Sequence, residues 1–422
     1  MSYQMAKIDL RYGTSAIEFE FDPARFEVIG NANDQTPMTD VEIGERFDSP
    51  IDSPRFDEMI GVGETVLIVV PDATRKTASA VIVDLLIRRL IANGSKPFDI
   101  RIIFATSIHR RVTENEKAEI LGAFIAQRIR TLDHDPRDLM KIVDLGRTES
   151  GVPIELNRAL FEHDHVIAVG GVSFHYFAGF TGGRKLICPG LASSRTVAAT
   201  HKLAFDCTKM DRRKGVNTGL LDGNAVHEAF VEVASHAKPA FAINSLVDDD
   251  GRITGLFCGD WITSHRAACE KYSVDHTIEL SGKRALVIAS CGGSPFDINL
   301  IQAQKALNAA SRACSDGGTI VLLAECGEGT GRKDFLDWFS STDSAGLARR
   351  LCENYKVNGQ TAWNLLRQTE RFDVRIVTKI DPESARRMRF IPEPSLADAI
   401  KAAPEGSGYI FTNASKVNVT TA

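Results

Sequence analysis

The pattern of apolar and polar positions along the chain predicts strands that alternate with helices. Segment 7–22 predicts two short strands around Tyr12-Gly13, because apolar residues recur at every second position on both sides of the glycine. An irregular, acidic stretch follows, and after it come continuous apolar runs, which are typical of strands buried on both faces. These runs occupy 65–70, 98–106, 163–175, 283–290, 319–326 and 373–380, with a shorter one at 409–412. Helical periodicity occupies 77–92, 113–124, 261–272 and 299–314.

Local signals support two of these assignments. Thr113 and Glu116 have the spacing of a capping box, which predicts that a helix begins there. Two strand-like runs flank Asp250-Gly251, a pair of residues that favours a hairpin turn.

Alternating strands and helices predict an α/β fold with two domains, each with a mainly parallel sheet flanked by helices. We expect an N-terminal α/β domain over 1–268, a hinge region over 269–282 and a C-terminal α/β domain over 283–422. The sequence has no internal repeat, low-complexity tract or long linker, so the hinge should be short. The active site is expected in the cleft between the domains.

Composition narrows the class of protein. The chain has 422 residues, of which 43% are hydrophobic and 25% charged, enough to bury sizeable cores. The formal net charge of -5 shows no basic excess, which argues against nucleic-acid and membrane partners. No secretory signal and no apolar run of about 20 residues is visible, so we expect a cytoplasmic protein. The eight cysteines form no CxxC pair, which predicts reduced thiols, mostly in the core, rather than disulfides or structural zinc.

Unusual polar clusters follow several predicted strands, and in open α/β sheets ligands bind beyond the carboxyl ends of strands. This coincidence predicts an enzyme. The first cluster is Asp72-Ala-Thr74-Arg75-Lys76. Its backbone N–H groups, hydroxyl and cations could hold a phosphate, and Arg75 could hold a carboxylate in a bidentate fork. A capped helix start with solvated charges explains the cluster equally well.

The second cluster, Ser107-Ile-His109-Arg110-Arg111, follows the next predicted strand. A histidine there can titrate near neutral pH and act as a general acid or base. A hydrogen-bonded structural histidine is the commoner role of any single histidine, so His109 alone does not decide between the two.

The third cluster runs from His175 through Gly182-Gly183-Arg-Lys185, with His201 downstream on a predicted helix. Adjacent glycines allow the backbone to approach a ligand closely, although the GxxxxGK[ST] spacing of a P-loop is absent. The lysine could be a nucleophile toward an activated acyl or thioacyl group, and the histidine could bind a metal. A simple anion site is an equally good interpretation.

The fourth cluster is Gly292-Gly293 with Gln302 and Lys305 in the second half of the chain. Gln302 and Lys305 are three positions apart, so on a helix they share a face and can point together into a cleft. Ordinary exposed helix positions are the alternative.

Together and in this order, the four clusters resemble the lactate racemase family that depends on a nickel-pincer nucleotide. The most specific segment is HYFAGFTGGRKLICPG (175–190) with His201 downstream, which is similar to the family's H-x-x-A-G-[FY]-[ST]-G-G-x-K pattern. DATR (72–75), SIHR (107–110) and GGSPFDINLIQAQK (292–305) match in order, so the resemblance covers nearly the whole chain.

The resemblance implies an isomerase, a nickel-dependent 2-hydroxyacid racemase or epimerase whose N-terminal domain binds the cofactor. The implied cofactor is the nickel-pincer nucleotide (pyridinium-3-thioamide-5-thiocarboxylic acid mononucleotide) with Ni(II), supplied by cofactor-biosynthesis proteins. Two sulfurs and one carbon of this cofactor with one imidazole form a planar set that suits Ni(II). The resemblance implies acid/base catalysis for His109 and His175 and nickel binding for His201. It implies cofactor binding for Lys185, which is covalently attached in some members, and for Asp72, Thr74, Gly182 and Gly183. The implied substrate-binding residues are Arg75, Gln302, Lys305 and Trp363, and Trp363 could equally pack in the core.

The chemistry of a small 2-hydroxyacid explains these residue types. Its carboxylate is already negative, so abstraction of the α-proton is a poor route and hydride removal is the alternative. A base takes the hydroxyl proton as hydride leaves the α-carbon for the cofactor, and hydride returned to the opposite face of the planar 2-ketoacid inverts the centre. Two histidines provide one base for each enantiomer, while cationic and amide groups hold the carboxylate and the developing ketone.

Two departures from the family pattern stand out. Ile301 replaces an aromatic residue of the lactate enzyme, which removes a hydroxyl near the substrate. Malate, 2-hydroxyglutarate, an aromatic hydroxyacid or a sugar acid are therefore alternatives to lactate. Ala225 replaces a proline, and we expect His227 beside it to be structural.

Three other functions compete with this hypothesis. An NAD-dependent oxidoreductase predicts GxGxxG after the first buried strand, and PDATRK supplies none. A zinc hydrolase built on His109, His175 and His201 would need a further ligand motif such as HExxH, which is absent. A non-catalytic carrier of a nucleotide or nickel cofactor of the same fold remains an alternative, because binding residues alone would satisfy it.

Overall fold

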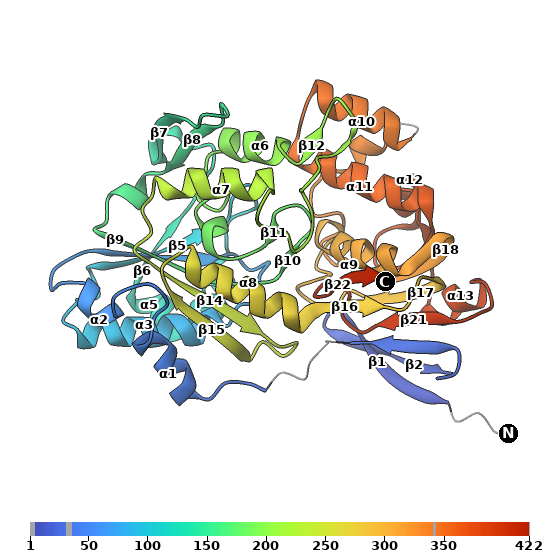
Figure 1. Cartoon of the computed structure of the whole chain (residues 1–422), viewed down its shortest axis with the longest axis horizontal. Coiled ribbons are helices and arrows are strands. Elements are labelled where there is room, and N and C mark those ends of the chain that lie inside the picture. Colours follow the sequence, from blue (N-terminus) through green and yellow to red (C-terminus); the bar gives the residue numbers. More distant parts are fainter. Residues whose placement is uncertain (1–4, 31–35, 341–342, 422) are drawn as a thin grey trace. The chain divides into compact units, whose positions relative to one another are not determined.

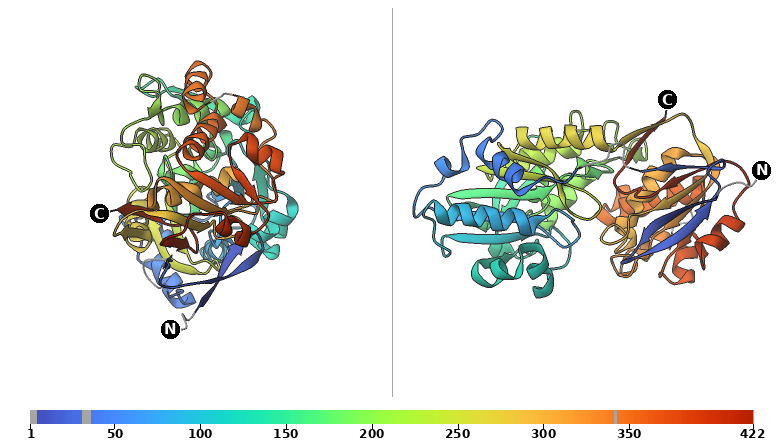
Figure 2. Two further views of the ribbon diagram at one scale, coloured as in Figure 1. Left: turned by 90° about the vertical axis from the view of Figure 1, so that its right-hand side faces the viewer. Right: turned by 90° about the horizontal axis from the view of Figure 1, so that it is seen from below.

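The structure is a computed structural model that describes residues 5–30, 36–340 and 343–421. The chain divides into two compact units (Figure 1). As far as their segments are described, unit 2 contains 35–204 and 214–272, and unit 1 contains 1–34, 205–213 and 273–422. Each unit is built on a six-stranded, mainly parallel sheet flanked by helices (Figure 2), which confirms the predicted α/β class.

The sheet of unit 2 is parallel except for one antiparallel hairpin at its edge. Its strands run in the order β15 (Ile253–Gly259), β14 (Phe241–Val247), β9 (His165–Gly171), β4 (Val66–Pro71), β5 (Ile100–Ala105) and β6 (Arg130–Asp133). Two small ladders are β7 (Ile142–Arg147) with β8 (Pro153–Asn157) and β10 (Phe174–His175) with β11 (Gly179–Phe180). The helices are α1 (Asp40–Asp48), α2 (Phe56–Met59), α3 (Ser79–Ala92), α4 (Glu114–Leu121), α5 (Ala123–Arg128), η1 (Leu139–Lys141), η2 (Arg158–Phe161), η3 (Gly183–Leu186), α6 (Ser194–Lys202), α7 (Ala225–Ser235) and the start of α8 (Thr263–His276).

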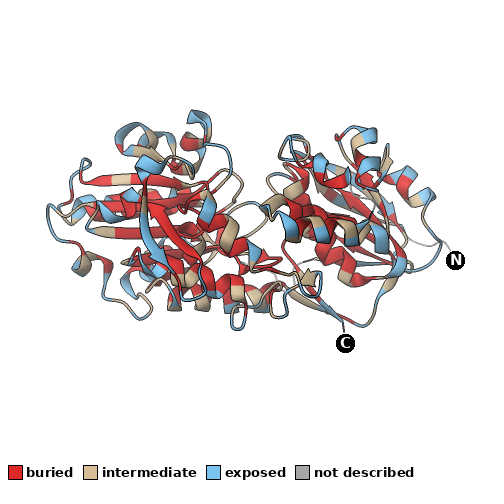
Figure 3. Ribbon diagram, turned by 90° about the horizontal axis from the view of Figure 1, so that it is seen from above, coloured by how far each residue is buried: buried red, intermediate tan, exposed pale blue. Residues whose placement is uncertain are grey.

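Local sequence explains these elements. All residues of β4 are buried, as its continuous apolar run requires, and Leu86 and Leu90 of α3 pack into the same core. Thr113 and Glu116 form the predicted capping box at the start of α4. The predicted hairpin joins β14 to β15, and Gly251 in its turn has a φ of 86°. Figure 3 shows the resulting layers, with buried strands inside and exposed faces on the helices.

The sheet of unit 1 is parallel throughout. Its strands run in the order β20 (Ile391–Glu393), β19 (Asp373–Val377), β18 (Cys314–Leu323), β17 (Arg284–Ser290), β21 (Gly408–Phe411) and β3 (Phe26–Ile29). Three small ladders are β1 (Ala6–Tyr12) with β2 (Ser15–Phe21), as predicted, β12 (Phe205–Asp206) with β13 (Asp211–Arg212), and β16 (Thr277–Leu280) with β22 (Asn418–Thr421). The helices are α9 (Leu300–Ala313), η4 (Leu336–Ser340), α10 (Ser344–Glu353), α11 (Val357–Arg371), α12 (Pro382–Arg387) and α13 (Leu396–Lys401).

The amino-terminal segment belongs to unit 1, which is otherwise formed mostly by the C-terminal half of the chain. β3 pairs in parallel with β21, and the Gly13 N–H donates to the buried carboxylate of Asp297 (2.8 Å). Both units are therefore discontinuous in sequence, whereas the predicted domains are contiguous. Within the predicted hinge region 269–282 lie the second half of α8 and β16. The passage between units after Tyr272 also falls there.

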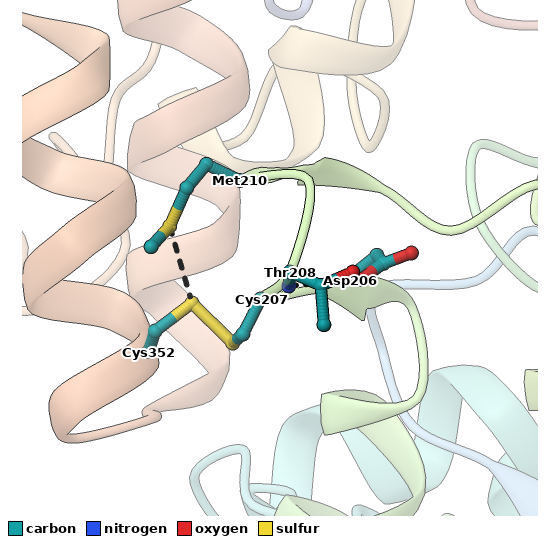
Figure 4. The surroundings of a disulfide bond; sticks show 5 residues. All are labelled: Asp206, Cys207, Thr208, Met210 and Cys352. Carbon is teal, nitrogen blue, oxygen red and sulfur yellow. Dashed lines mark hydrogen bonds between the residues drawn. A yellow bond between two sulfur atoms is a disulfide. The ribbon is translucent and has the colours of Figure 1, made fainter.

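The prediction that all cysteines are reduced thiols is wrong for Cys207 and Cys352, which form a disulfide (Figure 4). Cys207 lies between β12 and β13, Cys352 lies in α10, and their Cα atoms are 5.6 Å apart, within the range of such bonds. A sequence separation of 145 leaves no local spacing that would predict the pair. The remaining six cysteines are buried free thiols, as expected.

Within residues 5–30, 36–340 and 343–421, every helix is too short or too polar to serve as a transmembrane segment.

Candidate active site

The polar clusters of unit 2 follow the strands at and beside β4, where the strand order of the sheet reverses. From β4 the chain adds β5 and β6 on one side, while β9 and β14 lie on the other. Because β4, β5 and β9 are parallel neighbours, their carboxyl ends share one edge. Asp72 follows β4, His109 follows β5, and His175 follows β9. These residues therefore lie where open α/β sheets bind ligands.

Asp72 orients His109. One carboxylate oxygen of Asp72 lies 2.7 Å from His109 Nδ1, and the other accepts from the Thr74 N–H (3.0 Å) and hydroxyl (2.5 Å). Burial alone raises the pKa of the Asp72 carboxyl, but His109, the charge of Arg75 and Thr74 together lower it to about 2. The carboxylate is thus ionised at neutral pH and accepts the Nδ1–H of His109. Arg75 is half-buried, and this burial lowers the pKa of its guanidinium.

Lys185 and His201 meet at the same two aromatic rings. The Lys185 ammonium lies 5.7 Å from the ring centroid of Phe177 and 5.0 Å from that of Phe230. The His201 ring, on α6, lies 5.1 Å from Phe177 and 5.5 Å from Phe230. Burial, and after it the charge of Lys185, lower the pKa of the His201 imidazole to about 3. His201 is therefore neutral across the physiological range.

His175 and His109 are each linked to this pair, the first by a ring contact and the second by its charge. The His175 ring packs edge-on against the Phe177 ring at 4.5 Å between centroids, so His175 and His201 flank one phenyl ring. After burial and Lys185, the charge of His109 also lowers the pKa of His201. The structure thus brings His175, Lys185 and His201 together around Phe177, and His109 acts on this group through its charge.

The two glycines before Lys185 face protein atoms. Gly182 has a φ of 72°, and a Cβ there would lie 3.0 Å from the Gly171 carbonyl oxygen. A Cβ at Gly183 would lie 2.6 Å from the His265 ring, and the Gly183 N–H donates to Asn244 (3.2 Å). Packing within unit 2 therefore requires both glycines, independently of any ligand that this backbone contacts.

The donor atoms decide which kind of metal site this group can form. No three His, Cys, Asp or Glu residues gather as a ligand set anywhere in the described parts of the chain. A metal bound by His201 would need its other donors from a bound organic group. The neutral imidazole of His201 is the metal-binding form, and Lys185 places an amine beside the same rings. These residues fit a metal carried by a cofactor, and they do not fit the alternative of a protein-only zinc site.

Three predicted substrate-binding residues lie in unit 1. Gln302 and Lys305 share a face of α9 as predicted, and the Lys305 ammonium donates to the Gln302 carboxamide oxygen (2.7 Å). α9 starts after the loop that follows β17, the strand at which the order of this sheet reverses. Trp363 is 2% exposed and packs edge-on against Phe205 in the unit 1 core, so its observed contacts are those of a core residue.

Two buried side chains next to the site carry no role in the sequence-based prediction. Asn224 caps α7 and donates to the Phe177 carbonyl (2.9 Å), and Arg184 donates to the Ala178 carbonyl (2.7 Å). An asparagine before a helix signals an N-cap, but its second contact, 47 positions away, has no sequence signal. His227, expected to be structural, is buried on α7.

Both halves of the chain are similar to known proteins. Residues 12–212 match the family model of the lactate racemase N-terminal domain, and residues 281–420 match that of the lactate racemase C-terminal domain. Lactate racemase of Thermoanaerobacterium thermosaccharolyticum is 30% identical over 98% of this chain and 97% of its own length. Lactate racemase of Lactiplantibacillus plantarum is 33% identical over 80% of this chain and 79% of its own length.

Solved structures are similar as well. The lactate racemase apoprotein of Thermoanaerobacterium thermosaccharolyticum superposes with a TM-score of 0.88 at 28% identity, covering 98% of this chain and all of its own. A protein from Thermotoga maritima shares the fold, with a TM-score of 0.74 at 20% identity over 92% of this chain and 100% of its own.

Fold and site together define an α/β protein with two candidate acid/base histidines, His109 and His175, at the carboxyl edge of a mainly parallel sheet. The chain belongs to the lactate racemase family, which confirms the resemblance inferred from its motifs. Membership in a family of racemases makes it an enzyme of the isomerase class.

Proposed function

We propose that this chain is a nickel-dependent racemase or epimerase of 2-hydroxyacids. The observation that carries the proposal is the grouping of His175, Lys185 and His201 around Phe177, with His109 close enough for its charge to act on His201. The relatives named lactate racemase support a small hydroxyacid as the substrate. Ile301, in place of an aromatic residue, favours testing acids larger than lactate.

Lys185 and His201 would hold the nickel-pincer nucleotide, the first through its amine and the second as a protein ligand of nickel. When bound, such a cofactor supplies a reversible acceptor for the hydride of the substrate's α-carbon. Phe177 and Phe230 exclude water from the space beside both residues, which strengthens electrostatic interactions there. The further cofactor contacts stay predictions, at Asp72, Thr74, Gly182 and Gly183.

His109 acts as a base through Nε2. The ionised carboxylate of Asp72 accepts the Nδ1–H, so in the neutral ring the lone pair is on Nε2 and can take the hydroxyl proton. His175 serves the opposite face of the substrate. Arg75 would bind the carboxylate, and its partial burial strengthens that interaction. The substrate-binding roles of Gln302 and Lys305 stay predictions.

The test uses full-length protein made in a host that synthesises the cofactor, with nickel content and intact mass measured before assay. Single enantiomers of lactate, malate, 2-hydroxyglutarate, an aromatic hydroxyacid and a sugar acid are incubated and the products resolved by chiral chromatography. We expect at least one to be interconverted. The proposal fails if fully loaded protein interconverts none of them.

A double variant separates an enzyme from a cofactor carrier. His109→Gln with His175→Gln should abolish interconversion while nickel content and bound cofactor mass stay at wild-type levels. Glu64→Gln is the matched control, because Glu64 pairs with His165 at 2.7 Å at the amino end of β9, away from the site edge. A carrier would keep its full function in the double variant. The cytoplasmic location and the cofactor-biosynthesis partners stay predictions.

A further inference from the structure

His175 lies at the start of a tight turn whose backbone contacts its own ring. Residues 175–179 join β10 to β11, and the Ala178 N–H donates to His175 Nδ1 (3.2 Å). A backbone N–H group can only donate, so Nδ1 must be an unprotonated acceptor. A neutral imidazole has one proton, and in His175 that proton is therefore on Nε2.

Asn224 fixes the peptide group that provides this N–H. Its Nδ2 donates to the carbonyls of Phe177 (2.9 Å), which belongs to the same peptide group, and Leu220 (3.0 Å). Its Oδ1 accepts from the N–H groups of Val226 (3.1 Å) and His227 (3.3 Å). Asn224 is completely buried and all its hydrogen-bonding positions are used, so its amide has one orientation. The bond to the carbonyl also polarises the peptide group, which strengthens its N–H as a donor.

Arg184 holds the next carbonyl of the turn. Its guanidinium donates to the Ala178 carbonyl (2.7 Å), and its Nη1 lies 3.1 Å from His265 Nε2, which faces the Thr181 carbonyl at 2.8 Å. The side chain is 2% exposed, and none of the ion pairs among the described residues includes it. Burying a cation without a carboxylate partner costs free energy. We therefore expect the Arg184 contact with the turn to have a function that offsets this cost.

Gly179 allows the turn to lie against this support. It has a φ of 75°, and a Cβ at this position would overlap the Leu220 carbonyl oxygen, the same oxygen that accepts from Asn224. The turn is thus fixed by its backbone as well as by two buried side chains.

His109 is fixed in the opposite way. Its Nδ1 faces a carboxylate oxygen of Asp72 at 2.7 Å, so Nδ1 donates and the neutral ring has its lone pair on Nε2. The two histidines therefore differ in which nitrogen carries the proton.

We infer that Asn224 and Arg184 are positioning residues that hold the 175–179 turn so that neutral His175 keeps its proton on Nε2. Given the proposed function, this makes the two acid/base groups unequal at rest. His109 is the resting base, and His175 is the resting hydrogen-bond donor to the substrate's oxygen. For His175 to take a proton on Nε2, its ring must first move its own proton to Nδ1 and give up the Ala178 N–H.

Imidazole nitrogens report this arrangement directly, because protonated and bare ring nitrogens differ strongly in ¹⁵N chemical shift. The experiment records long-range ¹H–¹⁵N spectra of full-length, cofactor-loaded protein labelled with ¹⁵N-histidine, about two pH units above the ordinary imidazole pKa of about 6.5. His175→Gln and His109→Gln assign the two signals. We expect a bare Nδ1 for His175 and a bare Nε2 for His109. A proton on Nδ1 of His175 overturns the inference.

Two asparagine variants test the positioning role. Asn224→Asp keeps the oxygen that caps α7 but loses the donor to Phe177, so the His175 signals should shift toward a mixture of tautomers. Asn157→Asp is the matched control, because Asn157 also caps a helix through Oδ1 and donates from Nδ2 to Nδ1 of another buried histidine, His134 (3.0 Å). It should change His134 and leave His175 unchanged. Equal effects of both variants on His175 would overturn the role of Asn224.

Arg184→Lys provides a second variant with a conserved charge. A single ammonium cannot reproduce both guanidinium contacts, so an intermediate shift of His175 is expected, and a wild-type spectrum overturns the role of Arg184. In activity, Asn224→Asp should lower kcat/KM at least tenfold in both directions alike, because the overall equilibrium constant fixes their ratio. If the tautomers are as expected but no acid is interconverted, the proposed function fails and the inference about His175 stands.

Discussion

Replacing Asp72 by asparagine should reverse the tautomer of His109 with almost no change in shape. Thr74 donates to one Asp72 oxygen through both its N–H and its hydroxyl. In Asp72→Asn these donors retain the amide oxygen, so the NH2 group takes the position that faces His109 Nδ1. An NH2 group only donates, and the His109 proton must then move to Nε2, where the lone pair of the base is needed.

The expected loss is large because it removes general-base catalysis. Such assistance contributes roughly 10²–10⁴-fold, which corresponds to about 3–5 kcal/mol of transition-state stabilisation. Stability should also change. The pKa of the Asp72 carboxyl is lowered from 3.8 to about 2, so its interactions contribute about 2 kcal/mol above pH 4, lost as pH falls from about 4 to about 2.

The assay compares kcat/KM of Asp72→Asn and wild type at equal nickel loading, with Glu64→Gln as the control carboxylate–imidazole pair. Urea unfolding is measured at several pH values from 6 downward. As the pH falls, the unfolding free energy of the wild type should drop by about 2 kcal/mol more than that of the variant, which has no carboxyl group to protonate at this position. The reasoning is refuted if Asp72→Asn keeps activity within about threefold of wild type, or if Glu64→Gln loses as much.

Three further changes have defined outcomes. Lys185→Ala should lose the bound cofactor mass and His201→Ala most of the nickel, with unchanged circular dichroism; nickel at wild-type levels in His201→Ala would exclude it as a ligand. Gly179→Ala should destabilise unit 2 by more than Gly223→Ala in thermal unfolding, because both have φ above 70° but a Cβ overlaps the Leu220 carbonyl only at Gly179; equal losses would contradict this. Cys207→Ser with Cys352→Ser should lower the unfolding free energy of unit 1 by up to about 5 kcal/mol, from a loop closure spanning 145 positions, and an unchanged denaturation midpoint would argue against the disulfide.

Elements with a continuous local pattern could be predicted from the sequence. The β4 run is buried on both faces and appears as an unbroken apolar segment, and the α4 capping box depends on two residues three positions apart. β3 could not be predicted, because it is four residues long, has an exposed centre and joins its sheet only through β21, nearly 400 positions away. The disulfide between Cys207 and Cys352 was missed for the same reason, because its partners are 145 positions apart and no local pattern joins them.

The candidate site divides in the same way. Asp72, His109 and His175 could be predicted because each follows a recognisable strand, and parallel strands bring their carboxyl ends to one edge. Asn224 could not be predicted as a support of His175, because its contact is to a backbone carbonyl and depends on how α7 packs in three dimensions. For Trp363 the reverse holds: its motif suggested a substrate contact, but the side chain is buried in the unit 1 core, and this packing explains its burial.

The fate of the α-hydrogen tests the central claim most directly. The cofactor-loaded enzyme is incubated in ordinary water with one enantiomer of its substrate that carries deuterium at the α-carbon, and the opposite enantiomer is isolated and analysed by mass spectrometry. Hydride transfer with His109 and His175 as acid/base groups predicts that the product retains the deuterium. Replacement of the deuterium by solvent hydrogen, in step with inversion, would contradict the account.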